Sequence, residues 1–195
     1  MWEIIRYQLS HLGDFSGRDV RRTFWVYLLF LVIVQILIGI VISAPMMGNI
    51  IGSVTQGVQS GMSEAEIQAA TYASLSNSLE PMAVYSMVLR LVTAALLLAS
   101  FVRRLHDAGF SGWLALIPVG TLLYSQIIGY LSLDHMQAMM DEAIASGNPQ
   151  FVVAISSETA ASGLIRWAGV LFVLIFGIMK SQPGPNRYGE EPARP

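Results

Sequence analysis

The sequence predicts an all-α, polytopic membrane protein with four transmembrane helices, and three observations support this fold class. Hydrophobic residues make up 54% of the 195 positions and charged residues only 12%, whereas about a quarter of a soluble domain is charged. Four apolar runs of 19 to 21 residues match the roughly 20 residues of helix that cross a bilayer core. The runs do not alternate apolar and polar residues, as the strands of a membrane β-barrel do, so we expect helices.

The four runs divide what we expect to be a single integral membrane domain, residues 1–195. A cleaved signal peptide is not expected from the first run, because more than twenty residues precede it and Pro45 adjoins the small-residue pair Ser43-Ala44. We therefore expect this run to stay as an anchor. The predicted spans are residues 24–43, 82–102, 113–131 and 162–180, the outer loops are 44–81 and 132–161, and the tail is 181–195.

The basic residues predict the orientation of the chain. Nine of the eleven lie before the first span, between the second and third spans, or at and after the end of the fourth. The two outer loops contain no Lys or Arg and carry seven acidic residues. Because basic residues concentrate on the cytoplasmic side of membrane proteins, we expect both termini in the cytoplasm, as an even number of spans also requires.

Three segments outside the spans have the pattern of short amphipathic helices. In the first outer loop, Ser63 and Glu66 form a capping-box pattern. The second outer loop and the N-terminus carry apolar residues at helical spacing. The outer helices either lie on the outer surface or extend the spans, and the N-terminal helix is expected in the inner membrane interface. The spaced residues are Leu133, Met136, Met139, Met140 and Ile144, with a stop at Gly147, and Trp2, Ile5, Leu9 and Leu12.

The stretch "RRLHDAGFSGW", residues 103–113, connects the second and third spans. Gly109 can adopt a positive φ and end the second helix, and Ser111 can cap the third. Trp113 stands where an interfacial indole is favoured. Asp107 follows Arg103 by four residues, which is the spacing of an ion pair within one helix.

Three stretches carry a resemblance to a known family. They are "FSGRDVRRTFW" (15–25), "RRLHDAGFSGW" and "PGPNRYGEEP" (183–192). In this order they resemble the motifs of the bacterial inner-membrane proteins called domain of unknown function 805, and the resemblance covers the chain except the two outer loops. It implies an integral protein of the bacterial inner membrane, and it implies no reaction, substrate or cofactor.

The three stretches all fall on the predicted cytoplasmic side, where their polar residues should converge. One interpretation is a site for an anion or a phospholipid headgroup, because guanidinium groups suit phosphate. The other is a polar clamp between tail and loops, in which Asp107 accepts hydrogen bonds from an arginine and Tyr188 packs at the interface. The candidate cluster consists of Arg18, Arg21, Arg22, Arg103, Arg104, His106, Asp107, Asn186, Arg187 and Tyr188.

Enzyme chemistry is not expected, and neither is a metal ion or another cofactor. His106 and Asp107 are adjacent on a helix and point about 100° apart, so they do not form a dyad. No serine or cysteine nucleophile motif is present, and the absence of cysteine excludes the Cys₄ and Cys₂His₂ zinc sites. His135 is predicted on the opposite side of the membrane from His11 and His106.

Arg90 lies inside the second apolar run, and an intramembrane charge is a functional hypothesis by default. It could bind an anionic substrate or line a polar path, or it could snorkel outward or pair with a buried carbonyl group. The sequence thus predicts a non-enzymatic membrane protein that acts through lipid or protein contacts at the cytoplasmic cluster. The alternative is a small-solute channel or transporter subunit that uses Arg90. A membrane lipid is the expected partner, with a protein partner or a second copy as alternatives, and nucleic acid is not expected.

Overall fold

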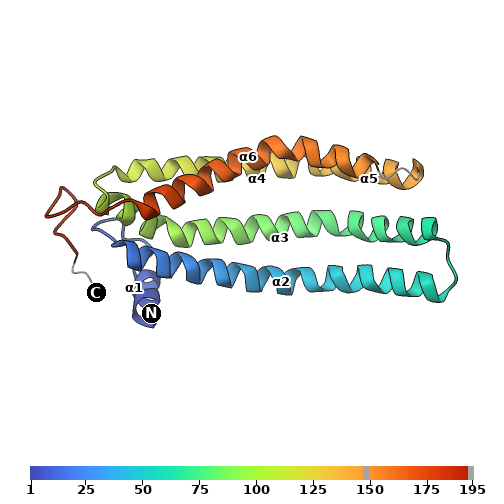
Figure 1. Ribbon diagram of the computed structural model, residues 1–195, viewed down its shortest axis with the longest axis horizontal. Coiled ribbons are helices and arrows are strands. Elements are labelled where there is room, and N and C mark those ends of the chain that lie inside the picture. The colour runs from blue at the N-terminus through green and yellow to red at the C-terminus, as the bar shows by residue number, and fades with distance from the viewer. Residues whose placement is uncertain (147–149, 193–195) are drawn as a thin grey trace. The chain divides into compact units, whose positions relative to one another are not determined.

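The computed structural model describes residues 1–146 and 150–192, and it describes only the backbone of residues 143, 144, 146 and 150–162. The described chain is helical and contains no β-strand; its only bridge joins Asn186 and Gly189. The elements, labelled in Figure 1, are α1 (Trp2–Ser10), α2 (Arg21–Gln59), α3 (Glu64–Asp107), η1 (Gly112–Ala115), α4 (Leu116–Leu131), α5 (Leu133–Ser146) and α6 (Gln150–Ile178).

The first predicted outer loop, residues 44–81, is helical on both sides of a turn at its centre. Helix α2 continues through Pro45 to Gln59, and α3 already begins at Glu64. The amphipathic helix expected after Ser63 thus extends the second span as the first part of α3, which is one of the two alternatives. The chain turns only around Gly61, whose φ is +70°. The capping box is confirmed, since the Ser63 amide donates to Glu66 Oε2 (2.8 Å) and the Glu66 amide to Ser63 Oγ (3.4 Å).

The second predicted outer loop contains the expected separate helix, α5, which follows α4 after the single residue Ser132. Leu133 is buried on it. The predicted stop at Gly147 and the side chain of Ile144 lie outside the described residues. Helix α6 contains the start of the fourth predicted span and ends two residues before the predicted end, at Ile178.

The N-terminal helix α1 forms, but its predicted apolar face is only partly correct. Its buried residues are Ile5 and Gln8, whereas Trp2 and Leu9 are exposed and Leu12 lies beyond the helix end. Gln8 is buried because its side chain forms hydrogen bonds with Asp19 and Arg103, which are described below. The outward residues Trp2 and Leu9 leave part of the apolar face of α1 uncovered.

Three helical segments of the described chain are long and apolar enough to cross a membrane: Arg21–Gln59, Glu64–Asp107 and Gly112–Leu131. The apolar segment Gly163–Ile178 is the part of α6 whose side chains are described, and the whole helix has 29 residues. These helices indicate an integral, multi-pass membrane protein.

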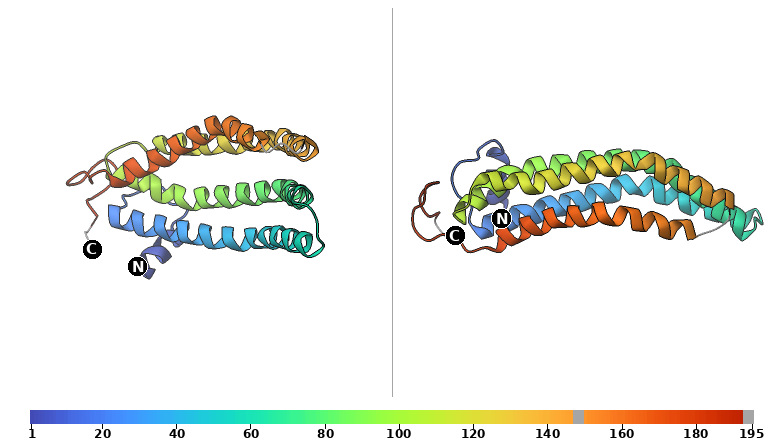
Figure 2. Two further views of the ribbon diagram at one scale, coloured as in Figure 1. Left: turned by 45° about the vertical axis from the view of Figure 1, so that its right-hand side comes forward. Right: turned by 90° about the horizontal axis from the view of Figure 1, so that it is seen from above.

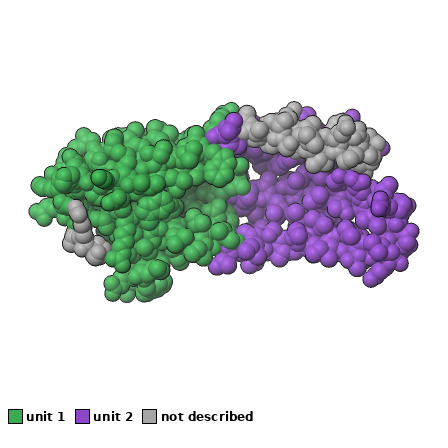
Figure 3. All heavy atoms as spheres, viewed as in Figure 1, with its two compact units in different colours: residues 1–36, 89–124, 165–195 green, residues 37–88, 125–164 purple. Residues whose placement is uncertain are grey.

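The chain divides into two compact units, coloured separately in Figure 3. Unit 1 comprises residues 1–36, 89–124 and 165–195, and unit 2 comprises residues 37–88 and 125–164. The core of unit 1 contains Phe24, Phe101 and Leu105, with Phe172 and Phe176 packed against it. In this unit α2 and α3 lie side by side (Figures 1 and 2), and the Tyr27 hydroxyl donates to the Leu96 carbonyl (3.2 Å).

Unit 2 contains the second halves of α2 and α4, the first half of α3, α5 and the beginning of α6. Here α2 and α3 are joined by a hydrogen bond between the Ser53 and Ser74 hydroxyls (3.0 Å). Near the turn, Gly57 lies against Ile67, where an added Cβ would come within 2.6 Å of a side-chain carbon. The side chain of Ile67 on α3 therefore packs directly against the backbone of α2 at this end.

Candidate functional site

The C-terminal end of α3 positions the central residues of the candidate cluster, because a Schellman motif ends the helix there. The Phe110 amide donates to the Leu105 carbonyl (2.9 Å) and the Gly109 amide to the His106 carbonyl (3.0 Å). Gly109 has a φ of +83°, as predicted. The predicted cap at Ser111 is wrong in part: Ser111 precedes η1, but its side chain makes no capping hydrogen bond.

Asp107 binds two arginines and a serine from three segments of unit 1. Arg18 forms a buried ion pair with Asp107 Oδ1, with its Nη2 atom 3.2 Å away. On the other oxygen, Oδ2, Arg104 Nη1 forms a second ion pair and the Ser181 hydroxyl donates a hydrogen bond (2.5 Å). Both carboxylate oxygens are thus occupied by donors of this chain.

Arg103 does not pair with Asp107, so the predicted pairing within the helix is wrong. It pairs instead with Asp19, with a distance of 3.2 Å from Nε to Oδ2. Its Nη groups donate to the His11 carbonyl (3.1 Å), the Asp14 carbonyl and Gln8 Oε1. Because the loop after α1 folds over the end of α3, it supplies these acceptors from far away in the sequence.

Asp19 has two further donors, both from buried side chains. Gln8 Nε2 lies 2.7 Å and Ser100 Oγ lies 3.1 Å from Asp19 Oδ2. Nearby, hydrogen bonds from the hydroxyl and the amide of Ser16 hold the pKa of the exposed Asp14 below its usual value. The loop between α1 and α2 is therefore fixed by local hydrogen bonds as well as by Arg103.

Arg18 and Arg104 also bind the end of α6 and the segment that follows it. Arg18 donates to the carbonyls of Gly184 (2.7 Å) and Gln182 (2.5 Å). Arg104 donates to the carbonyls of Gly177 (3.4 Å) and Met179. Hydrogen bonds to backbone carbonyls fix the path of the tail without requiring a particular side chain there.

His106 and the last motif form a second contact with the tail. The rings of His106 and Tyr188 stack with centroids 3.7 Å apart and an interplanar angle of 7°. Asn186 donates to the His106 carbonyl (2.9 Å), and His106 Nδ1 lies 3.3 Å from the Gly17 carbonyl oxygen. The tail therefore lies against the same helix end that binds the loop after α1.

We define the clamp as Arg18, Asp19, Arg103, Arg104 and Asp107, all of them buried. It holds three guanidinium groups against two carboxylates, and backbone carbonyl groups and the Gln8 side chain accept further hydrogen bonds from the guanidinium groups. No buried side-chain nitrogen or oxygen among the described residues lacks a hydrogen-bond partner. The structure thus brings together seven of the ten predicted cluster residues, namely Arg18, Arg103, Arg104, His106, Asp107, Asn186 and Tyr188.

The other three predicted residues, Arg21, Arg22 and Arg187, are exposed. Arg187 lies over the ring of Tyr188, 4.7 Å from its centroid. Sequence reasoning did not identify Asp19, Gln8, Ser100 and Ser181 as members of this site. Asp19 lies inside the stretch "FSGRDVRRTFW" directly after Arg18, and its position between basic residues was the available signal.

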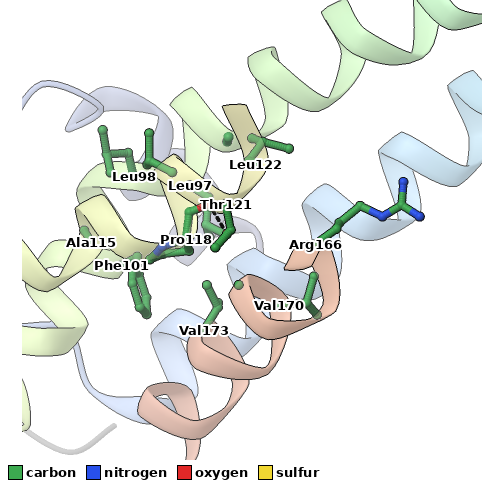
Figure 4. A pocket seen from close by; sticks show the side chains of 13 residues that line it. Leu97, Leu98, Phe101, Ala115, Pro118, Thr121, Leu122, Arg166, Val170 and Val173 are labelled. Atoms are coloured by element: carbon green, nitrogen blue, oxygen red, sulfur yellow. Dashed lines mark hydrogen bonds between the residues drawn. The ribbon is translucent and has the colours of Figure 1, made fainter. Parts of the chain in front are cut away.

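Arg90 lies apart from the clamp, half-buried on α3 in unit 1. Between α3, α4 and α6 the same unit contains a cavity of about 160 Å³ (Figure 4). Its lining is apolar apart from Thr121 and Arg166, and the guanidinium group of Arg166 points away from the other lining side chains. The shape and chemistry of this cavity suit hydrocarbon rather than a polar solute.

Comparison with known proteins gives one match. The family model described as "Protein of unknown function (DUF805)" matches residues 12–190, which include all three motifs. No curated protein matches the chain. No solved structure matches it either.

Proposed function

Because the chain belongs to the DUF805 family, whose description assigns no function, we propose the following role. The chain is a non-enzymatic integral protein of the bacterial inner membrane. It crosses the membrane four times, with both termini in the cytoplasm. It binds anionic phospholipid headgroups at the end of unit 1 that carries the clamp.

The observation that carries this proposal is the contrast between buried and exposed basic residues. The guanidinium groups of the clamp already bind carboxylates and carbonyls, so they act as a frame. Exposed basic side chains lie on the segments that contribute to this frame, and we call four of them the basic rim. Each one near an anionic membrane surface contributes about 1 kcal/mol to binding. The basic rim consists of Arg6, Arg21, Lys180 and Arg187.

Exposed aromatic residues support a membrane surface at this end. Trp2 on α1 is 69% exposed, and Trp113 in η1 is 78% exposed. Indole rings favour the level of the lipid headgroups, where the N–H group can contact water while the rest of the ring contacts the apolar region. Together with Arg6, the uncovered face of α1 has the composition of a helix that lies in the membrane interface.

The geometry of the clamp supports a role without catalysis. Asp107 accepts hydrogen bonds from Arg18, Arg104 and Ser181, and these donors occupy the positions that a substrate proton would need. His106 is stacked on Tyr188 and directed at a backbone carbonyl. Neither group is placed to pass a proton to the other.

Lipid retention tests the proposal. Native mass spectrometry of the gently solubilised protein, with phosphatidylglycerol and phosphatidylethanolamine added in equal amounts, should show preferential retention of phosphatidylglycerol. The variant Arg6→Ala/Arg21→Ala/Lys180→Ala should weaken that retention about 100-fold, because three surface charges are removed. The matched control Asp134→Ala/Asp141→Ala/Glu142→Ala removes three exposed acidic groups of unit 2 and should retain the lipid. Equal retention by wild type and the basic-rim variant would contradict the proposal.

A further inference from the structure

Helix α2 carries a line of exposed apolar side chains within unit 2. They are separated alternately by three and four residues, which is the spacing of a coiled-coil seam. The exposed fractions are 57% for Leu37, 60% for Ile40, 52% for Met47, 59% for Ile51, 38% for Val54 and 66% for Val58. We call Leu37, Ile40, Ala44, Met47, Ile51, Val54 and Val58 the α2 stripe.

A bilayer cannot cover the whole α2 stripe. Helix α2 has 39 residues and is therefore about 58 Å long, against a hydrocarbon core of about 30 Å. If Arg22 marks one edge of the core, about 20 residues reach the other edge, near Ser43. A tilt of about 40°, the upper end of the usual range, lengthens this path to about 26 residues, which still ends before Ile51. With Arg22 at that edge, Ile51, Val54 and Val58 lie beyond the hydrocarbon and need another apolar cover.

We propose that the α2 stripe pairs with the α2 stripe of a second copy of this chain. Two copies inserted in the same membrane have the same orientation, so their α2 helices run parallel to each other. The two copies are then related by a two-fold axis along the membrane normal. In such a pair each stripe residue lies at the level of its own counterpart, and the spacing places all seven in one seam. The partner thus supplies an apolar surface of matching length and register.

The charge distribution permits a second copy at this surface. No Asp, Glu, Lys or Arg occurs on α2 between Thr23 and Gln59, so the pairing brings no like charges together. Exposed polar residues of this helix segment, such as Asn49 and Gln56, lie about 150–170° around the helix from the middle of the stripe. They would stay outside the seam.

The backbone next to the stripe leaves room for close approach. A Cβ added at Gly48 would meet no heavy atom of this chain within 4 Å. Its lack of a side chain therefore serves no packing inside the described chain. Between two membrane-type helices, small residues at this position allow the backbones to come closer.

Cysteine cross-linking in native membranes tests the dimer, since the chain has no cysteine of its own. Ile51→Cys, Val54→Cys and Val58→Cys should each give a disulfide-linked dimer on mild oxidation, because counterpart positions in a parallel seam approach within disulfide range. Asn49→Cys and Gln56→Cys are the matched controls on the same helix and should stay monomeric. Cross-linking at all five positions alike, or at none of the three stripe positions, would overturn the proposal. Lipid or another protein would then cover the stripe.

A second variant separates dimer formation from folding. Gly48→Leu fills open space in the monomer but blocks the close approach of two α2 helices. The dissociation constant of the dimer, measured by dilution, should therefore increase about tenfold, with no loss of helix content. Gly39→Leu, at another open position off the stripe, should leave the dimer unchanged. An unchanged dimer in Gly48→Leu would remove close backbone approach from the proposal, and loss of dimer in both variants would overturn the assigned seam.

Discussion

Arg18 and Asp107 stand 89 positions apart in the sequence and form a fully buried ion pair, with 3.2 Å between Arg18 Nη2 and Asp107 Oδ1. The same arginine binds the carbonyls of Gln182 and Gly184. One guanidinium group thus joins the loop before α2, the end of α3 and the tail. This arrangement explains why arginines occur in motifs that are distant in the sequence.

Asp107→Asn should destabilise the protein strongly. Removing the charge leaves Arg18 and Arg104 buried without their carboxylate, and breaking a buried ion pair costs about 3–5 kcal/mol. Thermal unfolding in detergent, followed by tryptophan fluorescence, measures the loss. The control Asp134→Asn changes an exposed carboxylate and should unfold near the wild-type temperature. If both variants unfold at that temperature, Asp107 does not hold the clamp.

Arg103→Lys should be nearly as damaging as Arg103→Ala. Arg103 donates to Asp19, Gln8 and two backbone carbonyls at once, and an ammonium group lacks the planar fork that reaches all of them. Protease accessibility of the loop between α1 and α2 should increase in both variants. Arg21→Lys, which alters an exposed arginine, is the control. Wild-type protection in Arg103→Lys would show that charge alone is sufficient at this position.

Tyr188→Ala should release the tail, whereas Tyr188→Phe should not. The stacked contact with His106 requires an aromatic ring but not the hydroxyl group. Limited trypsin digestion followed by mass spectrometry should show faster cleavage after Arg187 in the alanine variant. Equal cleavage in the alanine and phenylalanine variants would mean that the Asn186 hydrogen bond, and not the stack, fixes the tail.

Gly169→Ala should destabilise unit 1 by about 1–3 kcal/mol through overpacking. An added Cβ would come within 2.1 Å of Thr121 Oγ1, whose hydroxyl donates to the Pro118 carbonyl. Combining it with Thr121→Ala removes that oxygen and should restore part of the loss. Thermal unfolding of the two single variants and the double variant measures the coupling. Additive losses would contradict a direct contact between these residues.

Local signals predicted the features that depend on neighbouring residues. The capping box at Ser63 and Glu66 and the positive φ of Gly109 were read correctly because each needs only a few adjacent positions. The extent of α2 was missed because polar residues such as Asn49 lower the hydropathy after Ser43, while nothing before Gly61 stops the helix. Hydropathy marks where a helix suits lipid, not where it ends.

Long-range contacts could not be read from one sequence. Arg103 was paired with Asp107 because four residues separate them, but Asp19, which is 84 positions away, binds it. The convergence of the three motifs followed from predicted topology, whereas the partners of each arginine depend on how the loop after α1 folds over α3. Gln8 was overlooked because a single polar residue on an amphipathic helix carries no sign of burial.

The central claim is that the clamp stabilises the fold and the basic rim binds lipid, and one comparison tests both parts. Lipid retention by native mass spectrometry and thermal unfolding would be measured together on Arg103→Ala and on Arg6→Ala/Arg21→Ala/Lys180→Ala. We expect Arg103→Ala to lower the unfolding temperature, whereas the basic-rim variant should lose anionic lipid and unfold at the wild-type temperature. Loss of lipid in Arg103→Ala at an unchanged unfolding temperature would contradict the central claim and identify the clamp itself as the headgroup site.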